Sequence, residues 1–207
     1  MKQQVVVIHG GDAFATYEEY ISYLKDFELD FESLKKTTRS WKKNLSSDLG
    51  DNFEVISPRM PNGYNAKYLE WKIWFEKLIP YLEPGIIFVG HSLGGIFLAK
   101  YLSEENFPKQ IKGCFLVAPP FNEDENGTRK IVEFTLPASL KKFEEQGGSI
   151  TIYHSKDDPI VPFGELLKYK KEIPSARTVE FHNQEHFFGE HFPELVTDIT
   201  SLSGVAK

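Results

Sequence analysis

Six short apolar runs recur along the chain at intervals too long for β-hairpins. They cover residues 5–9, 53–57, 86–89, 111–118, 150–154 and 178–182. Helical patterns separate most of them, and one pattern repeats at three- and four-residue steps at Tyr68, Trp71, Trp74, Phe75 and Leu78. Strands that alternate with helices predict βαβ units, and continuous valine and isoleucine runs are typical of strands buried on both faces. The pattern therefore predicts an α/β fold with a doubly wound, mainly parallel six-stranded sheet and helices on both faces.

Two segments are longer than a minimal plan of strands and crossovers requires. Residues 18–50 predict two helices, one of which carries Trp41, Leu45 and Leu49 on a single apolar stripe. Residues 121–135 are polar and have no clear period, which predicts a loop over the strand ends. This loop is either a small lid or a surface excursion without a role, and the pattern favours neither.

The composition fits one globular domain over residues 1–207, because 41% of the residues are hydrophobic and the chain is short for two domains. A formal net charge of −6 argues against nucleic acid as a partner. The local basic residues are interpreted as a solvated helix face: Lys35, Lys36, Arg39, Lys42 and Lys43. The single cysteine, Cys114, is expected to be buried in a strand. We find no signal peptide or membrane span, which predicts a cytoplasmic protein without membrane contact.

A glycine-flanked serine follows the third apolar run directly. Residues 90–94 read Gly-His-Ser-Leu-Gly, and the next residues predict a largely buried helix. This context is typical of a nucleophile elbow, in which a sharp strand-to-helix turn holds the serine in a strained conformation with its oxygen exposed. An ordinary glycine-rich turn is the alternative interpretation. The motif makes Ser92 the candidate nucleophile.

Two other strand ends carry the partners that a nucleophilic serine needs. The serine needs a base, most often histidine, and the histidine needs a carboxylate that fixes its tautomer. Asp157 and Asp158 follow the fifth apolar run, and His186 lies on a loop after the sixth. Ligands of parallel α/β sheets bind at the carboxyl ends of the strands, where these residues are predicted to meet. The chain order Ser, Asp, His is that of an α/β-hydrolase.

The chain resembles the α/β-hydrolase superfamily over most of its length, and within it the small, nearly lidless serine hydrolases similar to retinoblastoma-binding protein 9. The resemblance rests on His-Gly-Gly at 9–11, Met-Pro-Asn at 60–62, Gly-His-Ser-Leu-Gly-Gly at 90–95, Asp-Asp-Pro-Ile-Val-Pro at 157–162 and Glu-His-Phe at 185–187. It implies a minimal lid, with Asp158 as the acid and His186 as the base. Asp157 remains the alternative acid. One departure is Glu185, where the family usually has glycine.

A tetrahedral intermediate carries a negative oxygen that needs preorganised donors. The backbone N–H of Leu93, at the start of the elbow helix, is the first candidate. The resemblance implies Gly11 as the second, because the donor follows the His-Gly pair in those hydrolases, and Asp12 is a near alternative. A mere tight turn is the competing interpretation of this stretch. His9 is expected to orient the loop.

Aromatic residues near the predicted strand ends are candidate pocket walls, although each taken singly is more often ordinary packing. They are Phe14, Tyr64, Phe121, Phe163 and Phe187. No His, Cys, Asp or Glu cluster has the spacing of a metal site, and the nearest set is better explained by the predicted catalytic residues. We therefore expect no metal and no cofactor.

These observations favour a serine hydrolase that acts on a small-molecule substrate, which is a small carboxyl ester or else a thioester or amide. An interaction module that keeps the hydrolase fold with little turnover is the alternative from another class, because fold does not fix function. A cofactor-free lyase or a haloperoxidase-like activity on the same three residues is a third hypothesis. The sequence leaves the acyl group, the released alcohol or amine and the oligomeric state open.

Overall fold

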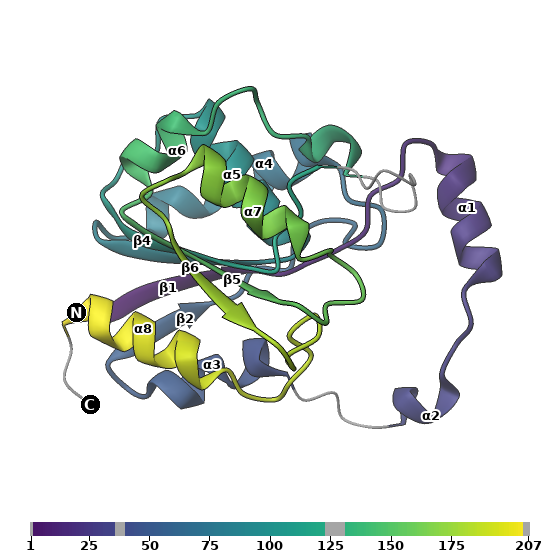
Figure 1. The fold of residues 1–207 in the computed structure, drawn as a ribbon, viewed down its shortest axis with the longest axis horizontal. Helices are drawn as coiled ribbons and strands as arrows, with labels where there is room; N and C mark the ends of the chain where they lie inside the picture. The colour runs from purple at the N-terminus through teal and green to yellow at the C-terminus, as the bar shows by residue number, and fades with distance from the viewer. Residues whose placement is uncertain (1, 36–39, 123–130, 205–207) are drawn as a thin grey trace.

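The computed structural model describes residues 2–35, 40–122 and 131–204, and a six-stranded sheet lies at its centre (Figure 1). The strands are β1 (Gln3–Ile8), β2 (Phe53–Ile56), β3 (Ile86–His91), β4 (Ile111–Val117), β5 (Ser149–Ser155) and β6 (Arg177–Phe181). Their order is β2-β1-β3-β4-β5-β6, and every neighbouring pair is parallel. The predicted sheet is confirmed.

Helices cover both faces of this sheet. In chain order they are α1 (Tyr17–Asp26), α2 (Phe31–Leu34), α3 (Trp41–Leu49), α4 (Tyr68–Leu78), α5 (Leu93–Glu104), α6 (Lys141–Gln146), α7 (Gly164–Glu172) and α8 (Pro193–Ser203), with 3-10 turns η1 (Ile79–Tyr81) and η2 (Val132–Phe134). Helices α4 to α7 lie on one face, and α3 and α8 lie on the other (Figure 1). This arrangement confirms the predicted doubly wound α/β architecture.

Each face of the sheet has its own apolar core, because successive strand side chains point to opposite sides. In β1, Val6 and Ile8 belong to the core beneath α4 to α7, whereas Val5 and Val7 belong to the core beneath α3 and α8. All residues of β3 are buried, as expected for a central strand covered on both faces. Helix α5 is also buried along most of its length. Even so, no helix among the described residues is long and apolar enough to cross a membrane.

The strand order changes direction at β1, which positions the site. After β1 the chain builds β2 on one side, and it then crosses over to build β3 on the other side. In open α/β sheets, ligands bind at such a switch point, outside the carboxyl ends of the strands. Gly10 and Gly11 follow β1 here, and Ser92 follows β3.

The segment at 18–50 differs from its prediction. It contains α1, α2 and α3 rather than two helices, because residues 31–34 form an additional short turn of helix. The predicted stripe of Trp41, Leu45 and Leu49 is buried on α3. Helix α1 has no buried residue and stands to the side of the molecule (Figure 1). The packing of this segment against the sheet therefore comes from α3.

Trp74 does not join the buried stripe of α4, because Trp71 and Phe75, four residues apart, already point at the core while Trp74 is 47% exposed. The predicted lid falls largely on residues 123–130, which lie outside the described residues. The described end of this loop, from residue 131, contains η2, in which Phe134 is buried.

Candidate active site

Ser92 occupies a strained turn between β3 and α5. Its backbone has φ 54° and ψ −121°, a conformation that costs a non-glycine residue on the order of 1–3 kcal/mol. The flanking glycines are required by close backbone approach. A Cβ on Gly90 would lie 2.5 Å from the carbonyl oxygen of Gly94, and a Cβ on Gly94 would collide with the carbonyl of Ile8. The five-residue motif therefore forms the predicted elbow for steric reasons.

A hydrogen bond joins the side chains of His186 and Asp158. His186 Nδ1–H donates to Asp158 Oδ2 over 2.8 Å, and both side chains are buried. The other carboxylate oxygen, Oδ1, accepts the backbone N–H groups of Ile160 and Val161, each over 2.8 Å. Because Nδ1 carries the proton, Nε2 of a neutral His186 has a free lone pair that can accept another.

Asp157 has a different set of partners. Its Oδ1 accepts the hydroxyl of Ser155 and, over 3.1 Å, the backbone N–H of Glu185. The Ser155 hydrogen bond, followed by the backbone donors, holds the pKa of the Asp157 carboxyl below its usual value. Asp157 thus ties the end of β5 to the loop that carries His186, while Asp158 contacts the imidazole.

The loop around His186 has an unusual backbone. Glu185 and Phe187, on either side of the histidine, have φ values of 48° and 57°, in the left-handed region. Glu185 therefore adopts, at some cost, a conformation that glycine adopts freely, which gives a physical reason for the glycine expected there. The carbonyl of Phe187 accepts the indole N–H of Trp41 over 3.0 Å, so α3 also helps to hold the loop.

Two backbone N–H groups near Ser92 are free to act as donors. Leu93 is the first residue of α5, where an N–H has no acceptor within the helix. Neither its N–H nor that of Gly11 has an acceptor among the described residues. The alternative donor, the N–H of Asp12, is already bonded to the carbonyl oxygen of Gly63 over 2.9 Å. The geometry favours Gly11 over Asp12 for this reason.

His9 connects the loop after β1 to the loop after β2. Its Nε2 accepts the backbone N–H of Met60 over 2.9 Å, and its Nδ1 lies 2.5 Å from the carbonyl oxygen of Gly10. If Nε2 accepts, Nδ1 carries the proton and donates to that carbonyl. The edge of the ring also packs on Trp71, with 5.6 Å between ring centroids. His9 thus holds the conformation of the loop that presents Gly11, as predicted.

We expect Gly11→Ala to lower kcat/KM by about 10²- to 10³-fold, the range seen when one oxyanion donor is lost. A Cβ at this position would lie 2.5 Å from the carbonyl oxygen of Gly63, so the loop must shift and carry its N–H away from Leu93. Steady-state kinetics and thermal unfolding measure the two effects separately. Gly164→Ala is the matched control, because a Cβ there has no atom within 4 Å. Unchanged kinetics in the Gly11 variant would exclude this N–H as a donor.

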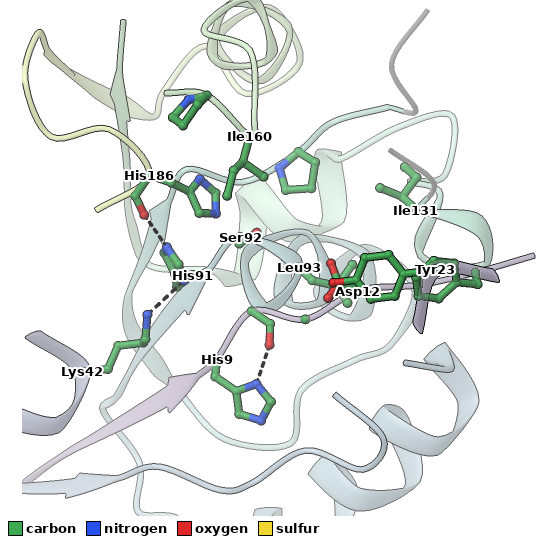
Figure 2. Close-up of a pocket in the computed structure, with 16 residues that line it drawn as sticks. His9, Asp12, Tyr23, Lys42, His91, Ser92, Leu93, Ile131, Ile160 and His186 are labelled. Atoms are coloured by element: carbon green, nitrogen blue, oxygen red, sulfur yellow. Dashed lines mark hydrogen bonds between the residues drawn. The ribbon is translucent and has the colours of Figure 1, made fainter. Parts of the chain in front are cut away.

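These groups meet at a cavity of about 640 Å³ (Figure 2). Ser92, His186, Leu93 and Gly11 all line it, so the structure brings together the predicted nucleophile, base and backbone donors. The remaining lining residues are His9, Gly10, Asp12, Ala13, Phe14, Tyr23, Lys42, His91, Pro120, Ile131, Pro159 and Ile160. The cavity therefore has apolar walls and a few polar groups, which is typical of a small-molecule site.

The five predicted pocket walls do not come together. Phe14 lines the cavity, whereas Tyr64 lines a second cavity of about 390 Å³. Phe187 is buried in the core beneath α3 and α8, because its backbone turns the ring away from the site. Phe121 and Phe163 pack against the core on the other face. Tyr23 and several aliphatic and proline side chains line the cavity instead of these four rings.

Two charged side chains line the cavity, and one of them, Lys42, was not predicted to be there. Asp12 has a carboxyl whose pKa is raised by burial, and Lys42 has an ammonium whose pKa burial lowers to about 8. The interpretation of Lys42 as part of a solvated helix face is therefore wrong. Burial, followed by the nearby Lys42 charge, also holds the pKa of His91 well below its usual value. The one signal in the sequence is that Lys42 directly follows Trp41, the start of the buried stripe.

Among the described residues, no group of three or more His, Cys, Asp or Glu side chains is arranged to hold a metal ion. Cys114 is buried, and burial raises the pKa of its thiol, so it is not a reactive thiolate.

The fully parallel sheet and the serine elbow after β3 give the protein the α/β-hydrolase fold. A family model of serine hydrolases matches residues 34–191, which is most of the chain. The protein thus belongs to the serine hydrolase family.

Similar proteins agree with this assignment. YdeN of Bacillus subtilis (strain 168), which is named as a hydrolase, is 26% identical over 195 residues, or 94% of this chain and 88% of YdeN. The crystal structure of the B. subtilis ydeN gene product has a TM-score of 0.75 at 22% identity and covers 99% of this chain and 100% of that one. A structure from a study of Nitrososphaera gargenis carboxylesterases has a TM-score of 0.58 at 15% identity, and the match covers 97% of this chain and 89% of that one. At these identities the structural likeness shows the shared fold.

Proposed function

We propose that this serine hydrolase cleaves a small carboxyl ester through an acyl-enzyme on Ser92, with His186 as general base and acid and Asp158 as the residue that orients His186. The observation that carries the proposal is the 2.8 Å hydrogen bond from His186 Nδ1 to Asp158 Oδ2, next to a cavity lined by both His186 and Ser92. A neutral imidazole held in this tautomer is the form that can accept a serine proton.

In the proposed reaction, Ser92 Oγ forms a bond to the substrate carbonyl carbon while its proton moves to His186 Nε2. The carbonyl oxygen becomes negative and accepts hydrogen bonds from the N–H groups of Leu93 and Gly11. The bond to the leaving oxygen then breaks, and His186 returns the proton to that oxygen. Water repeats the sequence on the acyl-enzyme and releases the acid. A thioester or amide would follow the same steps with a sulfur or nitrogen leaving atom.

A fluorophosphonate probe combined with a substrate panel tests this proposal. We expect covalent labelling of the wild-type protein, with the modified peptide mapping to residues 90–95, and turnover of 4-nitrophenyl esters with short acyl chains. Matched thioesters and anilides then show whether the protein prefers an ester, a thioester or an amide. A folded protein that is neither labelled nor active on any member of the panel would contradict the proposal and favour an interaction module instead.

A further inference from the structure

One lysine at the cavity has no carboxylate partner among the described residues. Lys42 lies in the first turn of α3, and its Nζ is 3.2 Å from Nδ1 of His91 and 5.2 Å from the ring centroid of Trp41. No carboxylate lies within ion-pair distance of Nζ in the part of the chain that the structure describes. A partly desolvated cation without a counter-ion is costly, so its retention beside the site suggests that it has an external partner.

The hydrogen-bond directions around Lys42 can be assigned. His91 Nε2 lies 3.0 Å from the backbone carbonyl oxygen of His186, which can only accept, so Nε2 carries the proton. Nδ1 of a neutral His91 is then an acceptor, and one N–H of Lys42 donates to it. The ammonium has three donors in total. Two of them are left for a group that enters the cavity.

The charges in the cavity are separated. Figure 2 shows Lys42 and Asp12 on opposite sides of Ser92, with Lys42 next to His91. Of the described residues that line the cavity, Lys42 is the only lysine or arginine. An anionic group would therefore be attracted to the His91 side and repelled from the Asp12 side. One ammonium balances the single negative charge of a carboxylate, whereas a phosphate monoester carries about 1.5 to 2 negative charges at pH 7.

We propose that Lys42 is a specificity residue that binds a carboxylate of the substrate, so that the preferred substrate is an ester with a free carboxylate in addition to the bond that is cleaved. This inference rests on the proposed esterase function and adds the substrate class to it. The carboxylate accepts the two remaining N–H groups of Lys42, and its charge replaces the missing counter-ion. The neighbouring Lys43 is exposed and does not line the cavity, so it offers a matched control.

The test compares charged and neutral esters of nearly the same shape. In the first pair, the carboxylate lies on the acyl side: 4-nitrophenyl hemisuccinate and its methyl ester. In the second, it lies on the leaving group: 4-acetoxybenzoate and its methyl ester. Each kcat/KM is measured near neutral pH, with the uncatalysed rate subtracted, for the wild type, Lys42→Met, Lys42→Arg and Lys43→Met. For each variant, the kcat/KM of the charged ester is divided by that of its neutral methyl ester. Comparing this ratio between variants cancels the intrinsic reactivity of the two esters.

We expect Lys42→Met to lower this ratio about 10- to 100-fold in one of the two pairs, or about 1.4–2.7 kcal/mol, because the variant loses a hydrogen bond to a charged group. Lys42→Arg should retain part of the preference, and Lys43→Met should retain all of it. The pair that responds shows on which side of the cleaved bond the carboxylate lies. Circular dichroism and thermal unfolding confirm that each variant is folded.

Three results would overturn the inference. One is an equal loss on both members of each pair in Lys42→Met, which indicates that Lys42 only positions His91 and His186. The second is an unchanged ratio in that variant, and the third is a wild type without any preference for the charged esters. In each case the neutral esters are still hydrolysed, so the esterase proposal stands. A wild type that hydrolyses none of the four esters contradicts the proposed function itself.

Discussion

Ser92→Ala is expected to abolish fluorophosphonate labelling and to lower kcat by about 10⁴-fold or more, because removal of the nucleophile from a serine hydrolase leaves only binding and oxyanion stabilisation. The substitution should leave the fold intact. The turn at Ser92 is held by its backbone N–H, which donates to the carbonyl of Val117 over 2.8 Å, and alanine retains this group. Gel-based labelling, ester kinetics and thermal unfolding together separate loss of chemistry from loss of structure.

Ser103→Ala is a suitable control for this experiment. Ser103 lies on the same helix, α5, and its hydroxyl donates to the carbonyl of Ala99 rather than lining the cavity. Labelling and turnover should match the wild type. If the Ser92 variant is labelled as strongly as the control, the probe reacts elsewhere and the assignment of the nucleophile is wrong.

The sheet and the order of the site residues could be predicted because buried parallel strands are apolar on both faces and therefore stand out in the sequence. The strand ends then indicate which residues share one edge of the sheet. The limits of β5, residues 149–155 against a predicted 150–154, illustrate how closely an apolar run follows a central strand. The same logic points to Ser92, Asp158 and His186 as candidates, since each follows a strand directly or by a short loop.

The walls of the cavity could not be predicted in this way. They depend on how loops and helix ends pack over the strand ends, and the apolar pattern of a single element does not contain that information. Phe187 was expected at the cavity but lies in the core, because the positive φ of its backbone directs the loop. Lys42 was expected in solvent but lines the cavity, because α3 packs through Trp41 beside the site.

Asp158→Asn is expected to lower kcat by about 10⁴-fold, the loss seen when the acid of a Ser-His-Asp triad is replaced by its amide. Asparagine retains Oδ1, which can still accept the N–H groups of Ile160 and Val161, so the turn after β5 should persist. An amide nitrogen would then face His186 in place of Oδ2. This donor favours the tautomer of His186 with its proton on Nε2, which cannot accept the proton of Ser92.

Asp157→Asn is the matched comparison, one residue away. Its Oδ1 can still accept the Ser155 hydroxyl and the N–H of Glu185, so we expect kcat to fall less than about tenfold, in line with the loss of charge in two hydrogen bonds. Both variants are compared by ester kinetics, with thermal unfolding as the measure of fold. If the Asp157 variant loses activity while the Asp158 variant keeps it, Asp157 is the acid. The hydrogen bond to His186 would then be structural, and the loop at 185–187 would have to move before reaction.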